Sequence, residues 1–457
     1  MAQIKTFGGR STSMILPIEE KYKLSKYNVF YQNGNVQYIW NTYSDALLEL
    51  SQSGQEYICS FSGTDDESDD FELLKTNGFI IYEQIDEFGR ACLLEKQTLF
   101  TNNPSNLTFV IAPGMKCNYR CNYCFQKTAD KMGIMTPEIA EKVAEYICCQ
   151  LERNPNIKRL RITWFGGEPL LYVNIIGIIS RKLIEYTQKN KIKYIATIIT
   201  NGRFLDAKNL SLLKEYCVEA AQITVDGHRD SYCKSKGASL KDFYSVINNI
   251  YNAADTIKIS VRLNIPDNNA DEAILTTDYL LNQCNLLGKV IVYFACVRDY
   301  SSTADVSQQS YIKYVQNYFK WLNHMIENYD MTEIKTAICN RKSRTISCGL
   351  ITPHNICIGP RGEFYKCEHN FGDNSMIIGN VWQGRFYNGV ETCYYTTIDH
   401  PSKYRCSQCE YLPVCMGECT NDWLSGFIKI DCNAYKQLFL KLKLLEGGVR
   451  VRLLDEP

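Results

Sequence analysis

Two kinds of hydrophobic pattern alternate through the middle of the chain. Short apolar runs of strand length are followed by longer segments whose apolar residues recur at helical spacing. This alternation is typical of parallel strands joined by helical crossovers. It predicts six strands and five helices. The strands are expected at residues 107–113, 159–164, 193–199, 221–225, 257–265 and 289–294, and the helices from Thr136 and at 175–188, 209–215, 241–253 and 270–282.

The first hundred residues have a different pattern. Residues 28–40 predict a β-hairpin around Asn33-Gly34, because Asn-Gly suits a tight type I′ turn. Helices are expected at residues 44–50, with Ser44 as N-cap, and at 71–78, followed by a strand at 79–83. Small strands with two short helices favour a winged-helix-like module. Such modules usually bind DNA, but no basic recognition helix is present here.

Composition narrows the class of protein. A chain of 457 residues suits about three domains. Lys plus Arg equals Asp plus Glu at 50 each, so no overall charge favours a nucleic acid or an anionic membrane. No apolar stretch is long enough for a membrane span or a signal peptide. Twenty-one cysteines without a secretion signal favour metal or thiol chemistry in a reducing cytoplasm.

Three cysteines lie on one short segment directly after the first expected strand. They are Cys117, Cys121 and Cys124, with the spacing C-x3-C-x2-C. Three thiolates on one loop can hold three irons of a four-iron cluster and leave the fourth iron open, since a complete cysteine set has four members. The alternative is a zinc knuckle or a group of core cysteines. Zinc sites prefer paired cysteines with a second pair elsewhere, and one such pair does exist downstream.

The cysteine spacing, with Tyr123 before the last cysteine, resembles that of the radical S-adenosylmethionine (SAM) enzymes. The resemblance implies that SAM binds the open iron, that one electron cleaves it, and that the resulting 5′-deoxyadenosyl radical abstracts a substrate hydrogen. The cofactor carries this chemistry, while the protein orients and shields it. The six strand–helix units resemble the family's open, partial (β/α)6 barrel, in which function lies at the C-terminal ends of the strands.

Two expected strands end in turns that match motifs of this family. Gly166-Gly167-Glu168-Pro169 follows the second strand and resembles the GGEP motif, whose backbone and carboxylate meet the amino group of SAM. Thr200 and Asn201 follow the third strand and resemble the contact on the ribose side. Either segment alone would also be explained as a plain turn.

The fourth and fifth strands alternate polar and apolar residues. The apolar face of a barrel strand packs against the helices, so the polar face points into the lumen. Polar lumen residues are costly unless they meet water or a polar ligand. We therefore expect Arg262 and Asn264 to bind the carboxylate or ribose of SAM, and Asp226 to act on the substrate side. The alternative is a satisfied buried ion pair, such as one between Asp226 and Arg262.

Seven cysteines in the last quarter match the SPASM extension of radical SAM enzymes. The pattern is C-x13-G-x4-C from Cys348, then C-x2-C-x5-C-x3-C, then a final cysteine. The resemblance implies two auxiliary [4Fe–4S] clusters, hence three [4Fe–4S] clusters in all. It assigns the outer cluster to Cys406, Cys409, Cys415 and Cys432, and the inner cluster to Cys348, Cys367 and Cys419. Cys357 is the candidate fourth ligand of the inner cluster, although it lies close to Gly362. The other ten cysteines are expected to be small apolar fillers.

The predicted layout has four parts: a leader-peptide module (residues 1–100), a radical SAM partial barrel (101–300), a bridge (301–345) with a helix at 311–329, and a SPASM domain (346–457) with a helix at 434–445. Modules of the first kind precede many peptide-modifying radical SAM enzymes and hold a leader peptide by strand addition. The leading hypothesis is a maturase of the sactipeptide/ranthipeptide type, which installs a cysteine thioether in a ribosomally made precursor peptide with an N-terminal leader. An electron donor such as flavodoxin or ferredoxin would be its second partner.

Two other functions remain open. An anaerobic sulfatase-maturing enzyme would oxidise Cys or Ser to formylglycine, and it would need no leader module. A non-catalytic metal-binding scaffold with a DNA-binding wing would not cleave SAM. Neither the identity of a peptide nor the pair of residues joined follows from the sequence.

Overall fold

The computed structural model describes residues 21–64, 67–100, 104–126, 133–297, 304–330, 344–349, 352–385, 406–417, 419–420 and 432–449. The cysteines proposed as ligands and the other predicted site residues all fall within these ranges. The chain divides into two compact units. One comprises Met1–Arg90 with Gln408–Glu410, and the other comprises Ala91–Ser407 with Tyr411–Pro457. Each unit is described by itself.

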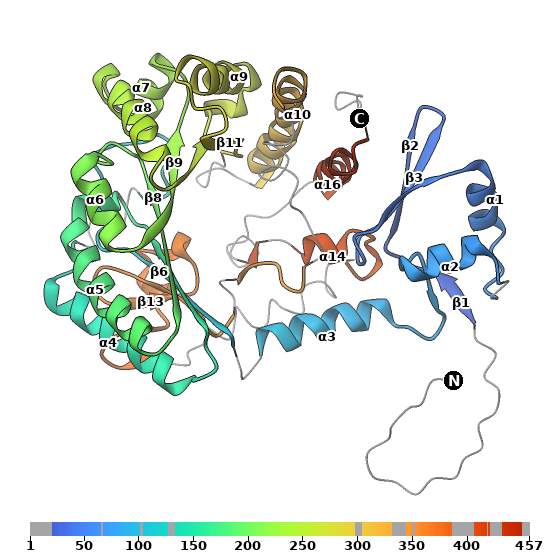
Figure 1. The fold of residues 1–457 in the computed structure, drawn as a ribbon, viewed down its shortest axis with the longest axis horizontal. Helices are drawn as coiled ribbons and strands as arrows, with labels where there is room; N and C mark the ends of the chain where they lie inside the picture. Colours follow the sequence, from blue (N-terminus) through green and yellow to red (C-terminus); the bar gives the residue numbers. More distant parts are fainter. Residues whose placement is uncertain are drawn as a thin grey trace, which may run out of the picture. The chain divides into compact units, whose positions relative to one another are not determined.

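The first unit contains two small antiparallel sheets and two short helices (Figure 1). The hairpin expected around Asn33-Gly34 is present, and a third strand extends it. A buried cluster that includes Ile39, Phe71 and Phe79 joins the sheets to the helices. The elements are β2 (Asn28–Asn33), β3 (Val36–Asn41) and β4 (Leu47–Leu50) in one sheet, β1 (Tyr22–Leu24) and β5 (Ile80–Tyr82) in the other, and helices α1 (Gln52–Ser60) and α2 (Asp69–Thr76).

The helix expected at residues 44–50 is wrong, because this segment forms strand β4 instead. Asp45 has a φ of 67°, which turns the chain back so that Leu48 pairs with Ile39. Pairing with β3 therefore overrides the local helix pattern. The helix begins only after the strand, where the Ser51 side chain accepts a hydrogen bond from the backbone N–H of Gly54 and caps α1.

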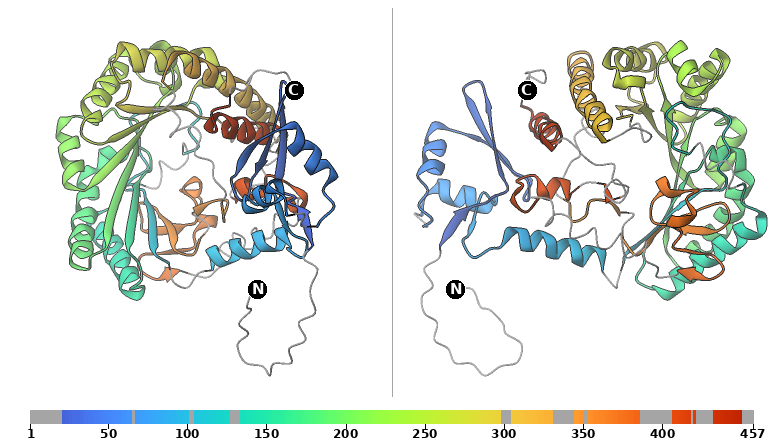
Figure 2. Two further views of the ribbon diagram at one scale, coloured as in Figure 1. Left: turned by 45° about the vertical axis from the view of Figure 1, so that its right-hand side comes forward. Right: turned by 180° about the vertical axis from the view of Figure 1, so that it is seen from behind.

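The second unit is built on six parallel strands that follow one another in chain order across a sheet. Helices cover the outer face of this curved sheet (Figures 1 and 2). The predicted partial (β/α)6 barrel is confirmed. The strands are β6 (Asn106–Ile111), β7 (Arg159–Trp164), β8 (Lys193–Thr200), β9 (Val218–Val225), β10 (Lys258–Leu263) and β11 (Val290–Phe294), and the main helices are α4 (Pro137–Arg153), α5 (Val173–Lys189), α6 (Ala207–Glu215), α8 (Leu240–Ala254), α9 (Ala270–Asp278) and α10 (Ala304–Asn328).

Helix α4 shows how the sequence produces these outer helices. Thr136 caps it by accepting from the backbone N–H of Ile139, and Pro137 occupies the first turn, where its missing N–H costs nothing. Ala140, Val143 and Ile147 recur at a spacing of three and four residues and are fully buried. That apolar stripe is the face turned towards the interior of the unit.

The sheet continues past β6 into the cysteine-rich end of the chain. Strand β12 (Asn355–Ile358) lies parallel to β6, with Cys357 opposite Val110. Three short antiparallel strands follow, namely β13 (Glu363–Tyr365), β14 (Gly379–Asn380) and β15 (Gly384–Arg385). The barrel and this part of the C-terminal segment therefore share one ten-stranded sheet. The hydrophobic pattern did not predict this continuation.

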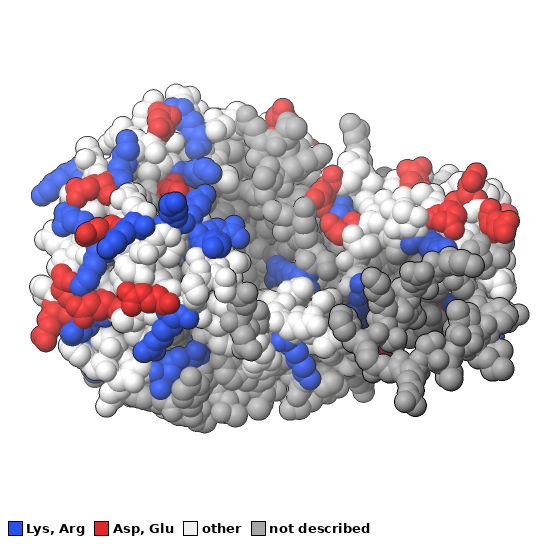
Figure 3. Space-filling view, turned by 60° about the horizontal axis from the view of Figure 1, so that its bottom comes forward, with Lys and Arg blue, Asp and Glu red and all other residues white. Residues whose placement is uncertain are grey.

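Helix α3 (Glu87–Leu99) and helix α7 (Asp230–Lys236) were not expected, whereas α10 and α16 (Cys432–Glu446) confirm the helices predicted at 311–329 and 434–445. In the described part of the chain, no helix is both long and apolar enough to cross a bilayer. Basic and acidic side chains are interspersed over the described atoms of the face in Figure 3.

Candidate active site

A cavity of about 500 Å³ opens at the C-terminal ends of the barrel strands. Its volume is within the range of small-molecule sites. The loop after β6 forms one wall, and Glu368 and His369 from the C-terminal segment form part of another. The structure brings ten of the predicted site residues to this cavity: Cys117, Cys121, Tyr123, Cys124, Gly166, Gly167, Thr200, Asn201, Arg262 and Asn264.

The cysteine loop is held in place by backbone hydrogen bonds to the end of helix α7. The N–H of Arg120 donates to the carbonyl of Lys236 at 3.0 Å, and the N–H of Asn122 donates to the carbonyl of Ser235 at 3.0 Å. From the strand side, Asn201 Nδ2 donates to Asn118 Oδ1 at 2.8 Å. The three thiols therefore stand on a loop whose backbone is fixed from two sides.

Gly166 and Gly167 pack the end of β7 directly against the start of this loop. A Cβ on Gly166 would lie 2.5 Å from the carbonyl oxygen of Gly114, and one on Gly167 would lie 2.3 Å from that of Met115. Gly166 also has a φ of 113°, which disfavours other residues. Both positions therefore require glycine for close backbone approach, and their backbone remains on the cavity wall.

Glu168 lies outside the cavity lining and is fully buried. Its carboxylate accepts hydrogen bonds from Thr200 Oγ1 at 2.7 Å, the Asn201 N–H at 2.8 Å and the Leu170 N–H at 3.0 Å. Burial raises the pKa of Glu168, and these hydrogen bonds oppose the rise. Glu168 therefore ties the end of β7 to the end of β8. Pro169, also buried, begins the short 3-10 helix Pro169–Tyr172.

Asp226 is fully buried and also lies outside the cavity lining. Its Oδ2 atom accepts from the Tyr123 hydroxyl at 2.7 Å and the Ser235 hydroxyl at 3.3 Å. The same atom forms an ion pair with Lys236 Nζ at 3.3 Å. A buried ion pair of Asp226 is therefore present, as the alternative expected, but its cation is Lys236 and not Arg262, whose Nε donates to Asn264 Oδ1 at 2.9 Å.

Lys236 is a cavity residue that the sequence pattern did not reveal. Its side chain is buried, with 1% of the residue exposed, and it lines the cavity beside the cysteine loop. Nζ donates to Thr224 Oγ1 at 2.6 Å and to the Tyr123 hydroxyl at 3.4 Å. Burial lowers the pKa of Lys236, but the Asp226 carboxylate and the loop thiols raise it more. A Lys-Gly pair is typical of the C-terminus of a helix, so residues 236–237 are the sequence signal that indicates a helix ending at Lys236.

The two sides of the cavity meet in an aromatic stack. The Phe125 ring, next to Cys124, stacks on the His369 ring, two residues after Cys367, with centroids 4.3 Å apart and planes 3° apart. Gln126 Nε2, on the same wall, is buried and has no hydrogen-bond partner among the described residues. A buried donor without a partner, facing a cavity, fits a site that is completed by a ligand.

The candidate ligands of the inner cluster lie close to one another in the second unit. Cys357 on β12 is fully buried against Val110, Met115 and Phe371. Burial raises the pKa of Cys357 well above its usual range, and Glu368, Cys367 and Cys348 add to the rise. Burial likewise raises the pKa of Cys367, to which Glu368, Cys419 and Cys348 contribute. Cys367 is therefore close enough to Cys348, Cys357 and Cys419 to interact electrostatically with each of them.

The candidate ligands of the outer cluster are placed on several elements. Cys406 begins the 3-10 helix Cys406–Gln408, Cys415 ends α14 (Leu412–Cys415), and Cys432 begins α16 and is exposed. Cys409 falls in the segment grouped with the N-terminal unit. Among the cysteines expected to be core fillers, Cys59, Cys149 and Cys217 are exposed, so that expectation is wrong for these three.

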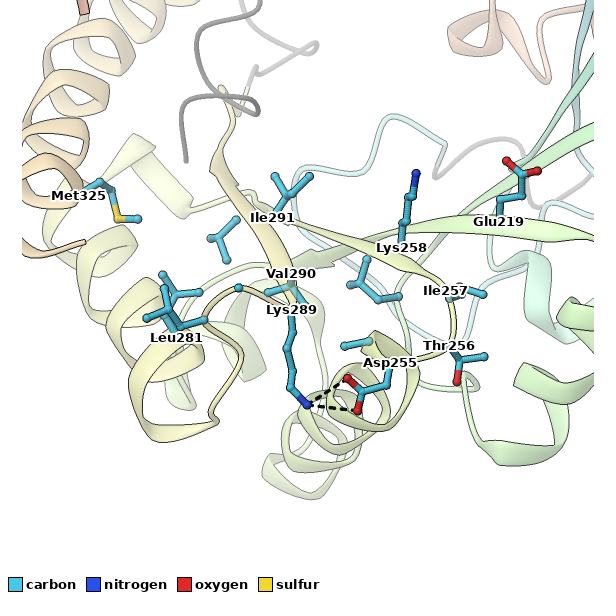
Figure 4. Close-up of a pocket in the computed structure, with 15 residues that line it drawn as sticks. Glu219, Asp255, Thr256, Ile257, Lys258, Leu281, Lys289, Val290, Ile291 and Met325 are labelled. Carbon is cyan, nitrogen blue, oxygen red and sulfur yellow. Dashed lines mark hydrogen bonds and ion pairs between the residues drawn. The ribbon is translucent and has the colours of Figure 1, made fainter. Parts of the chain in front are cut away.

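A second hollow, of about 820 Å³, lies at the opposite ends of the strands (Figure 4). Its lining is mostly apolar, and Lys289 and Asp255 form an ion pair of 3.1 Å at its edge. The hollow surrounds the N-terminal ends of β10 and β11. In barrels of this kind, chemistry lies at the C-terminal ends of the strands, so the smaller cavity is the candidate site.

Comparisons with known proteins find a family and a relative that match part of the chain. The Radical SAM superfamily model matches residues 111–280. "Radical SAM cyclopropyl synthase TigE" of Paramaledivibacter caminithermalis is 34% identical over 159 residues, 31% of this chain and 32% of that protein. The chain thus matches about a third of the length of this curated relative.

One solved structure resembles the fold, and a second is a weaker match. "Native anSMEcpe with bound AdoMet and Cp18Cys peptide" has a TM-score of 0.56 and 17% identity, and the match covers 76% of this chain and 100% of that chain. SuiB of Streptococcus suis bound to S-adenosylmethionine has a TM-score of 0.43 and 15% identity, with 88% and 96% covered. At such identities the likeness concerns the fold alone.

A radical SAM domain implies a [4Fe–4S] cluster and SAM, and the cavity residues fit both. Within the described residues, no three His, Cys, Asp or Glu side chains are placed to hold a single metal ion. The ligands of a four-iron cluster each bind a different iron, so they stand further apart than the ligands of one ion. Cys117, Cys121 and Cys124 would hold the cluster. Lys236 and Arg262 offer cations, and Asn264 an amide, to the polar groups of SAM.

Proposed function

Residues 111–280 of this chain are a radical SAM domain, and from that premise we propose that the protein is a radical SAM maturase of a precursor peptide. The observation that carries the proposal is the cavity itself. The cysteine loop forms one wall, and residues beside a candidate auxiliary-cluster ligand form another. A substrate placed between them would lie near both centres.

The residues of the chain would position the reactants. When bound, the loop cluster and SAM supply a 5′-deoxyadenosyl radical that removes a hydrogen atom from the substrate. Lys236 and Arg262 would hold the carboxylate of SAM by charge, and Asn264 and Asn201 would hydrogen-bond its ribose. Tyr123 is oriented through its hydroxyl by Asp226 and Asn264, so its ring can form a fixed wall for the adenine. Phe125 and His369 would exclude water on the substrate side.

The N-terminal unit would bind the leader of the precursor. The three-stranded sheet has two edge strands, β2 and β4, and an edge strand offers backbone groups for strand addition. A hollow of about 200 Å³ lies in the same unit. Tyr43 in this hollow packs against the Arg90 guanidinium, 5.0 Å from the ring centroid. A solved structure of similar fold holds both SAM and a peptide, which supports a peptide substrate.

The product we propose is a cysteine thioether, formed between a substrate carbon radical and a thiolate with one electron passed to an acceptor. The relative TigE is a cyclopropyl synthase, which favours a second candidate product. In this product the substrate radical forms a new carbon–carbon bond. Either product would have a mass that is two hydrogen atoms lower than the mass of the precursor. Alkylation of free thiols before and after reaction separates them, because only a thioether consumes a thiol.

The purified protein is expected to carry close to twelve irons after anaerobic reconstitution, from about three four-iron clusters. With SAM and a one-electron reductant it should release 5′-deoxyadenosine. Iron and zinc analysis and chromatography of the nucleoside measure both. One or two bound zinc ions and no nucleoside would support the scaffold function instead. Formylglycine in a sulfatase-derived peptide, with no reaction on a leader-bearing peptide, would support the sulfatase-maturing function.

Removal of residues 1–95 is expected to leave SAM cleavage largely unchanged and to weaken precursor binding at least tenfold. Strand addition supplies affinity away from the reacting centre, so the loss should appear in binding. Calorimetry with the full precursor measures it, and a precursor without its leader is the matched control. If the shortened enzyme binds and modifies the full precursor as well as the intact one does, the leader-binding role is wrong.

Cys357→Ala is expected to lower both auxiliary iron content and product yield while SAM cleavage persists. The Cys357 thiol interacts electrostatically with those of Cys348 and Cys367, and Cys367 in turn with Cys419, as in a closed four-cysteine set. A closed cluster takes the electron without binding the substrate thiolate. Iron analysis and product mass spectra test this, with Cys284→Ala, on a different part of the barrel, as the control. Unchanged iron and yield would show that Cys357 is not a ligand and that the inner cluster has an open iron.

A further inference from the structure

Lys366 is a buried cation in the second unit, between strand β13 and Cys367. Only 1% of the residue is exposed. Its Nζ atom donates to the carbonyl oxygens of Thr352 at 2.6 Å and Asn355 at 3.0 Å. The acidic residue in the strand beside it, Glu363, instead forms an ion pair with Arg361 at 3.4 Å. Within the described residues, no carboxylate forms an ion pair with Lys366.

A buried ammonium group normally requires an anionic partner. Carbonyl dipoles satisfy its hydrogen bonds but do not balance its charge, and an unpaired buried charge is strongly unfavourable. Arg385, at the end of β15, is a second cation that binds the turn at residues 352–355. Its Nη1 atom donates to the carbonyl of Pro353 at 2.6 Å. The surroundings of Lys366 therefore carry positive charge that calls for an anion.

The side chains that could supply this anion are the candidate ligands of the inner cluster. Tyr365, the residue directly before Lys366, pairs with Cys357 across strands β13 and β12. Cys367 is its neighbour in the chain and interacts with Cys348 and Cys419. A four-iron cluster held by four thiolates carries net negative charge. Such a group would complete the charge balance around Lys366.

We propose that Lys366 is the counter-charge of the inner auxiliary cluster and raises its reduction potential. This inference rests on the proposed function, specifically on an iron–sulfur cluster held by Cys348, Cys357, Cys367 and Cys419. Net charge and hydrogen bonding around a cluster are among the main determinants of its potential. A fixed positive charge favours the reduced form, which carries one more negative charge.

A higher reduction potential of the inner cluster favours the thioether formation proposed for the cavity. When a carbon radical joins a thiolate, the sulfide forms and one surplus electron must pass to an acceptor. A cluster that is easier to reduce accepts this electron more readily. Glu368 acts in the opposite direction, since its carboxylate lies against one of these ligands: the Cys367 thiol donates to Glu368 Oε2 at 4.0 Å. The pair Lys366 and Glu368 would therefore set the potential from two sides.

The test is a potentiometric titration of the reconstituted full-length protein followed by electron paramagnetic resonance. All variants are made in a background in which Cys117, Cys121 and Cys124 are alanine, so that only auxiliary clusters contribute. Lys366→Met removes the charge and the donor, Lys366→Gln removes the charge but keeps a donor, and Lys366→Arg keeps both. Lys241→Met, at an exposed position on helix α8, is the matched control. Iron content is measured in every sample.

Both neutral variants are expected to shift the inner-cluster equilibrium at least tenfold towards the oxidised form, about 59 mV for a one-electron couple. Lys366→Arg and Lys241→Met should leave it unchanged, Glu368→Gln should shift it the opposite way, and the outer cluster should not move. With Cys117, Cys121 and Cys124 intact, SAM cleavage should persist in the three Lys366 variants and in Lys241→Met. If both neutral variants lose auxiliary iron while Lys366→Arg retains it, the charge requirement is also supported.

Unchanged potentials in Lys366→Met and Lys366→Gln at full iron content would overturn the counter-charge role. Loss of auxiliary iron in all three Lys366 variants, Lys366→Arg included, would also overturn it, because the charge would not suffice. A wild-type protein without auxiliary-cluster signals would refute the cluster assignment itself. That outcome can be told apart from a failure of the counter-charge role, in which the cluster is present but its potential does not depend on Lys366.

Discussion

The variants Cys117→Ala, Cys121→Ala and Cys124→Ala are each expected to release no 5′-deoxyadenosine from SAM. Three thiolates leave one iron open for SAM, and a site with two thiolates cannot hold the cluster in place. The loop cannot compensate by moving, because the end of α7 and Asn201 hold its backbone and side chains from two sides. Chromatography of the reaction mixture measures the nucleoside.

Cys149→Ala is the matched control for these three variants. Cys149 is an exposed cysteine on helix α4, outside the cavity, so its loss should change neither iron content nor SAM cleavage. Each loop variant should lack about four irons relative to this control and keep the auxiliary irons. Normal nucleoside release in any one of the three would rule out the loop as the SAM-cluster site.

The second large effect is expected for Lys236→Met. This change leaves the Asp226 carboxylate fully buried without its cation, which typically costs about 3–5 kcal/mol of unfolding free energy. It also removes a cation from the cavity wall, so SAM binding should weaken by at least tenfold. Denaturant unfolding and equilibrium binding of SAM measure the two effects separately.

A double variant separates the ion pair from the cavity charge. Lys236→Met with Asp226→Asn removes both charges, so most of the lost stability should return while SAM binding remains weak. If SAM binding returns as well, Lys236 acts only through Asp226 and does not contact the cofactor. Lys236→Arg, which keeps the charge, is the conservative control.

Asp226→Asn alone distinguishes two roles for this residue. A catalytic role on the substrate side predicts slower product formation with SAM affinity unchanged. A positioning role, through Tyr123 and Lys236, predicts weaker SAM binding and lower stability together. The hydrogen bonds from Tyr123 and Ser235 to a carboxylate away from the cavity lining favour positioning.

Local patterns predicted the barrel and most of its polar lining. Strands 258–263 and 218–225 alternate polar and apolar residues, and their polar faces do line the cavity at Arg262 and Gln222. Tight turns at strand ends placed Gly166 and Asn201 correctly beside the cysteine loop. These features depend on residues near one another in the chain, which is why periodicity and motif spacing capture them.

The features that were missed depend on residues far apart in the chain. The segment at 44–50 carries a helix pattern, but pairing with β3 makes it a strand. Lys236 sits on a short helix without a strong apolar stripe, and only the fold brings it to Tyr123 and Thr224. Strand β12 has four residues, too few for a periodic signal, and its partner β6 lies at the other end of the barrel sequence.

The pairing of β12 with β6 has a consequence for how the chain reaches its native state. β6 is the first barrel strand to be synthesised, but the strand that covers its outer edge is made only when most of the chain is complete. An uncovered edge of apolar residues such as Phe109 and Val110 is a site for wrong pairing and aggregation. Contacts between such distant segments also form slowly. We therefore expect chains that stop before residue 355 to be poorly soluble, and slow synthesis to lengthen the period in which nascent chains need chaperones.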